Sequence, residues 1–254
     1  HGLKLTGLKL TWEELTRMMG YWVDMEHPYI TYENNYIESV WWLLKNLYDK
    51  KLLYKGYTIQ PYSPAAGTGL STHELNQPGC YRNVRDTSAV AMFRVDKGLV
   101  INVKGRNIWN NIDKSKEDIF FLAWTTTPWT LPSNCALAVG GGIVYSMIKT
   151  FNPYSHAPIN VVLAKELVSK YFSKKNAELK LEEYKPGEKN IPFKIIDEFS
   201  GYDLDAIRYE QLLPFVQPQG KAFEVVVGDF VTTEDGTGIV HIAPSFGADD
   251  FKVA

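Results

Sequence analysis

Apolar residues recur at helical spacing in the first part of the chain, so residues 12–57 are predicted to be mainly helical. Trp42 and Leu43 broaden the apolar face, and the helix is therefore expected to pack on both sides. Gly56, which follows a lysine-rich turn, is a normal place for a helix to end. The stripe of apolar residues along this helix is interpreted as core, since aromatic side chains bury large apolar areas. Its members are Ile37, Val40, Trp41, Leu44, Leu47 and Tyr48.

From about residue 57 the chain changes to short apolar runs between glycines and prolines, a pattern typical of strands. A helix is predicted over 163–172, and the lysine- and glutamate-rich segment 165–189 is expected to be solvated. Asp235–Gly236 predicts a hairpin turn, because glycine accepts the positive φ that such turns need. The predicted strands are 57–60, 89–95, 118–124, 143–148, 159–163, 222–227, 230–233 and 238–242.

Many short strands with a few helices predict an α+β fold, in which a β-barrel-like domain carries N-terminal connecting helices. Residues 1–95 are expected to form the connecting helices and short strands, and residues 96–254 the β-barrel domain. A chain of 254 residues is long enough for one large domain or two modest ones.

Composition narrows the classes of partner. The formal net charge of -2 argues against a module that wraps nucleic acid through a basic face, but it leaves room for a domain that receives only the end of an RNA. Two cysteines, Cys80 and Cys135, make no disulfide framework, so a reducing, cytoplasmic compartment is the simpler expectation. No apolar run approaches membrane-spanning length and no signal peptide is evident, so no membrane partner is expected.

Three consecutive threonines, Thr125, Thr126 and Thr127, precede Pro128 at the end of an apolar run. Alternation places the first and third on one face of a strand and the second on the other. Pro128 favours an extended Thr127 and interrupts the ladder, so the backbone can turn toward a ligand. Threonine also favours strands in general, and an ordinary edge strand is the alternative. A tryptophan between two prolines, followed by Asn134, is a poor strand and a good pocket wall.

A histidine and a pair of acids lie near the end of the chain. His241 is on a predicted strand that runs into a loop with proline and glycine, a normal place for a site, although a lone strand histidine is more often structural. Asp249 and Asp250 follow where a helix is expected to begin, and either could cap that helix. In the alternative interpretation, one carboxylate holds an ammonium group through a charge-assisted hydrogen bond.

The two stretches 124–130 and 236–250 together resemble the editing site of isoleucyl-tRNA synthetases. The valine and leucine enzymes carry arginine at the third threonine position. The isoleucine enzymes carry threonine there and continue Pro-Trp-Thr-Leu-Pro, as residues 128–132 do here. The resemblance covers nearly the whole chain from about Trp12 and is weakest from about 152 to 181. It implies an editing domain of the type found in isoleucyl-, valyl- and leucyl-tRNA synthetases, with a connector from the catalytic domain.

The resemblance implies hydrolysis of tRNA mischarged with valine, and of valyl-adenylate as a second substrate, with isoleucine excluded by size. One binding pocket separates side chains that differ by a methylene by only roughly 1–3 kcal/mol, and isoleucine against valine is the established example. The implied partners are the tRNA 3′ end carrying valine and the rest of the synthetase, without a cofactor. The chain lacks the His-x-Gly-His and Lys-Met-Ser-Lys-Ser elements of the synthetic site, so no aminoacylation by this fragment is expected.

The family pattern also implies a role for each site residue. The three threonines would position substrate and water, Asp250 would hold the α-ammonium group, and Asp249 would be structural. A water, rather than a protein nucleophile, is expected to attack a carbonyl that nearby donors polarise. The residues implied to bind substrate and shape the pocket are Trp129, Thr130, Asn134 and His241.

Residues 61–68 resemble a zinc knuckle in which many relatives carry two cysteines, but these positions are Ser63 and Ala66 here. Neither residue can bind zinc as a thiolate does, and His73 alone is a weak ligand signal. No metal site is therefore predicted.

Two other function classes stay open. The first is a module that binds the tRNA 3′ end without hydrolysis, against which an intact Thr127 and Asp250 argue. The second is an unrelated β-barrel hydrolase with a nucleophilic serine or cysteine. No Gly-x-Ser-x-Gly element is present, and Cys135 lies in an apolar run.

Overall fold

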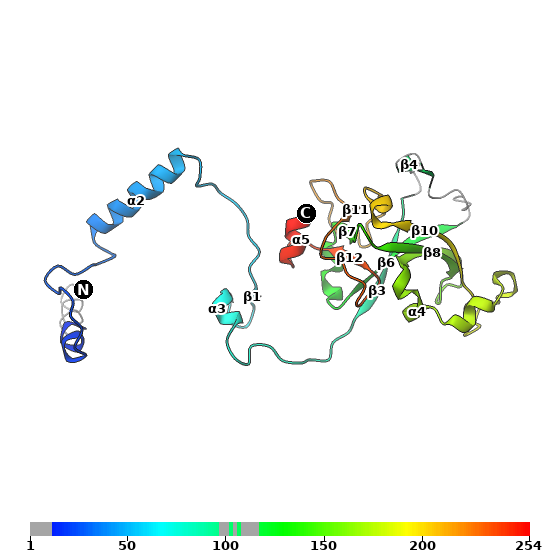
Figure 1. The fold of residues 1–254 in the computed structure, drawn as a ribbon, viewed down its shortest axis with the longest axis horizontal. Helices are drawn as coiled ribbons and strands as arrows, with labels where there is room; N and C mark the ends of the chain where they lie inside the picture. The colour runs from blue at the N-terminus through cyan, green and yellow to red at the C-terminus, as the bar shows by residue number, and fades with distance from the viewer. Residues whose placement is uncertain (1–11, 97–101, 104–105, 108–116) are drawn as a thin grey trace. The chain divides into compact units, whose positions relative to one another are not determined.

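The computed structural model of the protein describes residues 12–96, 102–103, 106–107 and 117–254. The chain divides into two compact units, His1–Thr58 and Ile59–Ala254. Figure 1 shows the helices and strands of each unit along the chain.

The first unit is less helical than its apolar spacing predicts. Residues 12–18 are helical and α2 spans Asn34–Asp49, but residues 21–33 are not helical. The prediction is wrong for that middle segment because Pro28 has no N–H to donate and disfavours a helical residue before it. Two helical pieces therefore form within the region that was predicted to be mainly helical.

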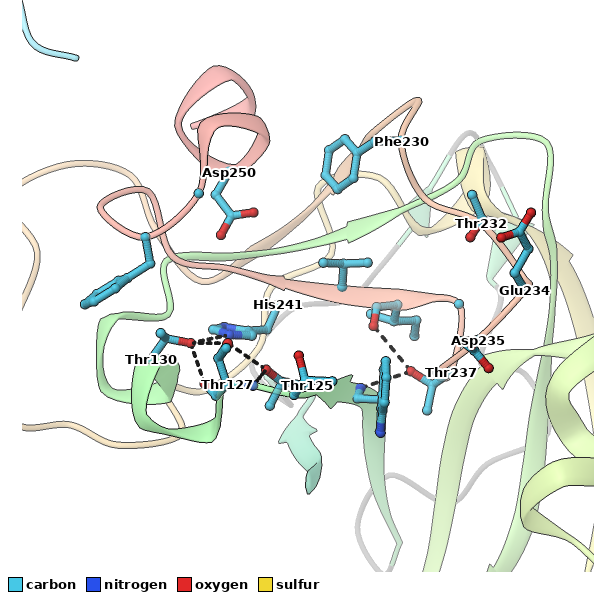
Figure 2. Close-up of a pocket in the computed structure, with 18 of the residues that line it drawn as sticks. Thr125, Thr127, Thr130, Phe230, Thr232, Glu234, Asp235, Thr237, His241 and Asp250 are labelled. Atoms are coloured by element: carbon cyan, nitrogen blue, oxygen red, sulfur yellow. Dashed lines mark hydrogen bonds between the residues drawn. The ribbon is translucent and has the colours of Figure 1, made fainter. Parts of the chain in front are cut away.

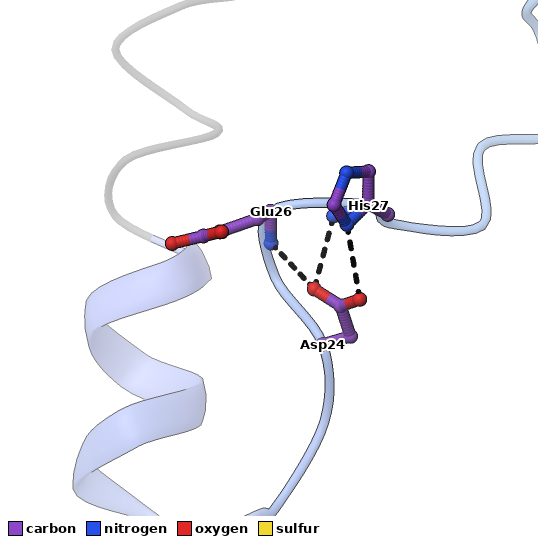
Figure 3. A network of polar contacts seen from close by, with 3 residues as sticks. All are labelled: Asp24, Glu26 and His27. Atoms are coloured by element: carbon purple, nitrogen blue, oxygen red, sulfur yellow. Dashed lines mark hydrogen bonds and ion pairs between the residues drawn. The ribbon is translucent and has the colours of Figure 1, made fainter.

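A side chain competes with the helix just before this proline (Figure 3). Asp24 accepts the backbone N–H groups of Glu26 and His27 at 3.0 and 3.1 Å, and its second carboxylate oxygen lies 3.1 Å from His27 Nδ1. The bonds from His27 are the main cause of a lowered Asp24 pKa. Such local bonds offer the backbone an alternative to helical pairing, and so they favour the turn.

Helix α2 ends earlier than the sequence predicts. Its last residue is Asp49, several residues before the expected stop at Gly56. Lys51 takes a left-handed φ of 58°, and its N–H donates to Tyr48 O at 2.8 Å. The chain thus leaves the helix through a left-handed turn made by a lysine rather than a glycine.

The apolar stripe of α2 is exposed. No residue of this helix is buried, and the side chains of Trp41 and Trp42 keep exposed fractions of 67% and 64%. Within the first unit, the expectation of packing on both sides is therefore not met. The spacing correctly predicts an apolar face, but no described residue of the first unit buries that face.

The second unit begins with a short hairpin, β1 (Tyr62–Ser63) with β2 (Thr68–Gly69), followed by α3 (Thr72–Leu75). The strand expected at 57–60 is not formed. Ser71 caps α3 and exchanges hydrogen bonds with Glu74, which makes this one turn of helix locally self-sufficient.

A five-stranded sheet forms the larger part of the second unit, in the order β10-β8-β9-β6-β3. Strands β6 and β9 run parallel, and the other neighbouring pairs run antiparallel. Four of its strands were predicted from their apolar runs, and β10 was not. The strands are β3 (Ala89–Arg94), β6 (Asp118–Thr125), β8 (Val144–Phe151), β9 (Pro158–Ala164) and β10 (Lys194–Ser200), and β4 (Asn102–Val103) pairs separately with β5 (Arg106–Asn107).

A second sheet has three strands in the order β11-β7-β12. The central strand β7 (Ala136–Val139) is buried throughout. One of its edges pairs in parallel with β11 (Glu224–Val227), and the other pairs antiparallel with β12 (Ile239–Ile242). The predicted hairpin between 230–233 and 238–242 is therefore wrong. Residues 230–233 form no strand, and the return strand pairs with β7 instead.

The core lies where the two sheets face each other. Phe93 and Phe121 come from the larger sheet and Leu137 and Ile239 from the smaller, and all belong to one buried cluster. The α+β class is confirmed, and the expected barrel-like part consists of two sheets around a shared core. The described strands do not close into one hydrogen-bonded ring. Short helices lie between the strands or, in the case of α5, after the last one: η1 (Pro128–Ser133), η2 (Lys165–Leu167), α4 (Val168–Tyr171), η3 (Lys174–Glu178), η4 (Leu181–Glu183), η5 (Gly201–Leu204) and α5 (Ala248–Val253).

The expected domain boundary between residues 95 and 96 differs from the division that the structure shows after Thr58. A boundary at 95 would place β3 in the first domain, whereas this strand pairs along its whole length with β6. Among the described residues, none of the helices combines the length and apolar character needed to span a bilayer.

Candidate functional site

The two stretches that carry the sequence signal meet in one cavity of about 570 Å³ in the second unit. Figure 2 shows Thr125, Thr127, Thr130 and His241 grouped together, with Asp250 approaching His241 from α5. Acidic residues of the loop before β12 lie toward the other end. The lining residues are Trp124, Thr125, Thr126, Thr127, Trp129, Thr130, Phe230, Thr232, Glu234, Asp235, Gly236, Thr237, Gly238, Ile239, Val240, His241, Phe246, Gly247 and Asp250.

The threonine segment forms where β6 ends. Thr125 is its last residue and is buried, and its hydroxyl accepts the Thr127 N–H at 3.0 Å. The Thr125 and Thr127 hydroxyl oxygens lie 3.3 Å apart, as alternation predicts, while Thr126 is exposed. Thr127 has φ -124° and ψ 64°, outside the extended region that Pro128 was expected to favour, and Pro128 then begins η1. The proline thus ends the strand and leaves threonine hydroxyls at the pocket.

His241 joins this segment from the other sheet. Its Nε2 lies 2.9 Å from the Thr130 hydroxyl, which donates its proton to Thr127 O at 2.8 Å. Because a hydroxyl has one proton, this pairing requires the imidazole proton on Nε2 and assigns Nδ1 as an acceptor. That Nδ1 is buried without a hydrogen-bond partner among the described residues. Burial lowers the His241 pKa, against the opposing effect of Asp250, and so favours the neutral ring.

Asp250 lies in the first turn of α5, but neither it nor Asp249 caps that helix, because the N-cap residue is Gly247. One Asp250 oxygen accepts the Ala243 N–H at 3.0 Å and so fixes the loop between β12 and α5. A Cβ on Gly247 would lie 3.1 Å from the Asp250 carboxyl carbon, so the glycine leaves room for this carboxylate. Asp249 is exposed and does not line the cavity.

The charged residues that line the cavity are all acidic. They are Glu234, Asp235 and Asp250, and no lysine or arginine belongs to the lining. Lys170 binds the loop from outside, through Glu234 O at 2.8 Å and Asp235 at 3.3 Å. A negative, partly enclosed pocket favours a cationic group over an anionic one.

Seven of the eight site residues predicted from the sequence line the cavity, and Asn134 does not. Asn134 is buried, donates to Ala136 O at 2.8 Å and accepts the Tyr209 hydroxyl at 2.6 Å. These bonds hold the end of η1 and occupy both ends of the amide. Trp129 does line the cavity and keeps 60% of its surface exposed.

Sequence reasoning missed part of the lining. Phe246 lies within the matched stretch, and its place there was the available signal. The sequence pattern identifies Asp235 only as a turn residue and indicates no role for Glu234 or Thr237. Their place depends on a turn that folds back onto β6, which no local pattern shows.

The lining holds no serine, cysteine or lysine among the described residues. Cys135 lies outside it, and burial raises the pKa of its thiol, which disfavours the nucleophilic thiolate. The arrangement can therefore orient a water and a substrate, but it offers no activated nucleophile of these kinds.

The segment that resembles a zinc knuckle closes without a metal ligand. The Ser63 hydroxyl accepts the Ala66 N–H at 3.2 Å and so stabilises the turn between β1 and β2. Among the described residues, no group of three or more His, Cys, Asp or Glu side chains is placed to hold a metal ion.

Comparisons with known proteins point to the same family as the sequence motifs do. Residues 7–213 match the family described as tRNA synthetases class I (I, L, M and V). Isoleucine--tRNA ligase of Cytophaga hutchinsonii is 63% identical over 246 residues, which cover 97% of this chain and 21% of that protein. The Bacteroides fragilis protein of the same name is 62% identical over 244 residues, with 96% and 20% covered. The chain thus spans about a fifth of the length of these relatives.

Among solved structures, a P. knowlesi cytosolic leucyl-tRNA synthetase editing domain is 17% identical, with a TM-score of 0.47 and 65% of this chain and 60% of that chain covered. The relatives confirm the resemblance to isoleucyl-tRNA synthetases that the motifs predict. The family model matches well over half of this chain, so the chain belongs to the class I tRNA synthetases of the isoleucine, leucine, methionine and valine group.

Proposed function

We propose that the second unit is an editing hydrolase of an isoleucyl-tRNA synthetase, which releases valine from mischarged tRNA and from valyl-adenylate and excludes isoleucine by size. One observation carries the proposal: three threonines, a neutral histidine and an aspartate converge on a pocket whose charged residues are all acidic. The tRNA 3′ end and the rest of the synthetase are the corresponding partners. We assign this activity to a chain that covers only about a fifth of the length of its isoleucine--tRNA ligase relatives.

The acidic character supports an aminoacyl ester as substrate. Such an ester carries an α-ammonium group, and Asp250 has one carboxylate oxygen bound to Ala243 N and a second that accepts no hydrogen bond from the described residues. The bound oxygen fixes the carboxylate, and the other can accept from the ammonium group. A charge-assisted bond of this kind orients the ester within the pocket.

The threonines support hydrolysis by water. Thr126 and Thr127 are exposed at the pocket, and the Thr125 and Thr127 hydroxyl oxygens form a close pair. Hydroxyls both donate and accept, so they can orient a water toward an ester carbonyl and stabilise the charge that develops on its oxygen. The absence of serine, cysteine and lysine from the described lining favours this direct route.

His241 supports exclusion by size. It is held by Thr130 and keeps only 7% of its surface exposed, so its ring cannot move aside without breaking that bond. A rigid ring can reject the extra methylene of isoleucine, which an apolar pocket would otherwise accept.

A deacylation time course tests the proposal. The wild type should release valine from Val-tRNA(Ile) and leave Ile-tRNA(Ile) intact, whereas His241→Ala should begin to hydrolyse Ile-tRNA(Ile) while still hydrolysing the valine ester. If the wild type binds the tRNA but releases no valine, the chain is a binding module for the 3′ end and the proposed hydrolysis is rejected. If His241→Ala loses valine release and gains none on isoleucine, the histidine is structural and does not exclude isoleucine.

A further inference from the structure

The two halves of the site belong to different sheets. Thr125 ends β6 in the five-stranded sheet, and His241 lies on β12 in the three-stranded sheet. No described ladder joins β6 to β12. The distance between the threonine segment and the histidine must therefore be set by contacts outside the ladders.

One buried side chain supplies such a contact. The parallel neighbour β9 pairs with β6 only from Asp118 to Phe121, so the last residues of β6 extend beyond that ladder. The Trp124 N–H donates instead to the Thr237 hydroxyl at 3.3 Å. At Trp124, the residue directly before Thr125, the Thr237 hydroxyl thus accepts the N–H that a neighbouring strand would otherwise bind.

Thr237 also forms hydrogen bonds with the ends of two other strands. Its carbonyl oxygen accepts the Ala164 N–H at the end of β9 at 2.8 Å, and its hydroxyl donates to Ile239 O at the start of β12 at 3.3 Å. The residue is 1% exposed. Its hydroxyl is engaged on both sides within the protein, so it acts through the strands rather than on a ligand.

The glycines on either side of Thr237 restrict its position. Gly236 and Gly238 have left-handed φ values of 72° and 74°. A Cβ at Gly236 would lie 3.0 Å from the Trp124 ring, and one at Gly238 would collide with the Ala164 Cβ. The turn is therefore pressed against the ends of β6 and β9, and side chains are excluded from both flanks.

We infer that Thr237 is a positioning residue of the site: its hydroxyl fixes the Trp124–Thr125 backbone relative to β12, and so sets the threonine segment against His241. This inference rests on the proposed hydrolysis. It concerns a residue that sequence reasoning left without a role and that makes no bond to the other site side chains among its described contacts.

Three variants of the protein test the inference. Thr237→Val has nearly the same shape but leaves the Trp124 N–H without its acceptor. Thr237→Ser keeps the hydroxyl. Tyr145→Phe is the matched control, because Tyr145 is also fully buried and its hydroxyl also links the sheets, through Gly140 N at 2.9 Å and Gly238 O at 2.6 Å, without a hydrogen bond to β6.

The measurements are kcat and KM for valine release, circular dichroism at the assay temperature, and amide hydrogen exchange at Trp124. For Thr237→Val, kcat should fall about 10- to 100-fold, the cost of a small displacement at a reacting centre. KM should stay within about twofold, because ground-state binding is not removed. Exchange at Trp124 should become about tenfold faster or more, and the fold should remain intact. Thr237→Ser should recover most of kcat, and Tyr145→Phe should keep it.

Several results would overturn the inference. An unchanged kcat in Thr237→Val beside an active wild type rejects the positioning role alone. Equal losses in the valine and serine variants show that the hydroxyl is not the cause. An equal loss in Tyr145→Phe shows that any loosening of the two sheets suffices. If the wild type releases no valine, the proposed function fails and the positioning role fails with it, even where exchange at Trp124 still reports the hydrogen bond.

Discussion

The two units of the chain differ in whether a regular apolar pattern becomes buried. In the first unit, Trp41 and Trp42 on α2 keep 67% and 64% of their surface exposed. In the second, Phe93 and Phe121 on neighbouring strands are 0% exposed. Both pairs belong to regular apolar patterns that the sequence shows clearly, yet only the second pair forms a core.

The difference separates two kinds of information in a pattern. Periodicity identifies the face of an element that gains free energy from burial. It does not identify the segment that buries that face. In the second unit the partner is present in the same chain, since two sheets enclose one cluster. In the first unit no residue of α2 is buried, so the same kind of pattern predicts an apolar face without a core.

The largest effect that sharpens this contrast is expected at Phe121. Phe121→Ala removes a fully buried ring from the shared core and should lower the free energy of unfolding of the second unit by about 3–5 kcal/mol. Phe215→Ala is the matched control in the same unit, because that ring is 74% exposed, and it should change stability by no more than about 0.5 kcal/mol. Urea unfolding followed by near-ultraviolet circular dichroism measures both. Equal losses would mean that exposure in the structure does not separate core from surface.

A smaller effect is expected at Asp250, where site and stability can be separated. A hydrogen bond to a charged group contributes roughly 1.5–3 kcal/mol, so Asp250→Ala should slow valine release about 10- to 100-fold. Asp250→Asn should slow it similarly, because the negative charge is lost, yet it retains an oxygen for the Ala243 N–H. Deacylation assays beside thermal melts should show a lower Tm mainly for the alanine variant. Full activity in the asparagine variant would reject the charge as the ammonium ligand.

A pH dependence should follow from His241. Burial lowers its folded-state pKa below the usual 6.5, so the unfolded chain takes up a proton at higher pH than the folded protein does. This stabilisation is therefore complete above about pH 6.5 and is lost as pH falls below it. Thermal melts of the second unit between about pH 7.5 and pH 5 should show a falling Tm. In His241→Leu, which has no proton to gain, the fall should be smaller, and an equal fall would assign it to other groups.

Local signals predict much of the second unit, because its strands β3, β6, β8 and β9 each carry their own apolar run. The threonine segment and His241 were expected to share a site, and their hydrogen bond through Thr130 brings them together. Failures occur where a partner is distant in sequence. Asn134 was expected at the pocket, but it pairs with Tyr209, 75 residues away, whose position no local pattern gives. The predicted hairpin at residues 230–242 is wrong because β12 pairs with β7, a strand far earlier in the chain, and residues 230–233 form no strand.

The smallest effect is expected on α2, and it tests the contrast from the other side. Trp42→Ala replaces a ring that is 64% exposed, so unfolding of the protein should change by no more than about 0.5 kcal/mol. A large, exposed apolar ring also offers a surface for association. The variant should therefore be monomeric to higher concentration than the wild type, and sedimentation velocity over a concentration series measures this. Leu43→Ala, with 56% exposure, is the control for loss of apolar area without loss of an aromatic ring. If Trp42→Ala lowered stability as much as Phe121→Ala does, then α2 would be covered in solution by part of this chain, and the contrast between the two units would be false.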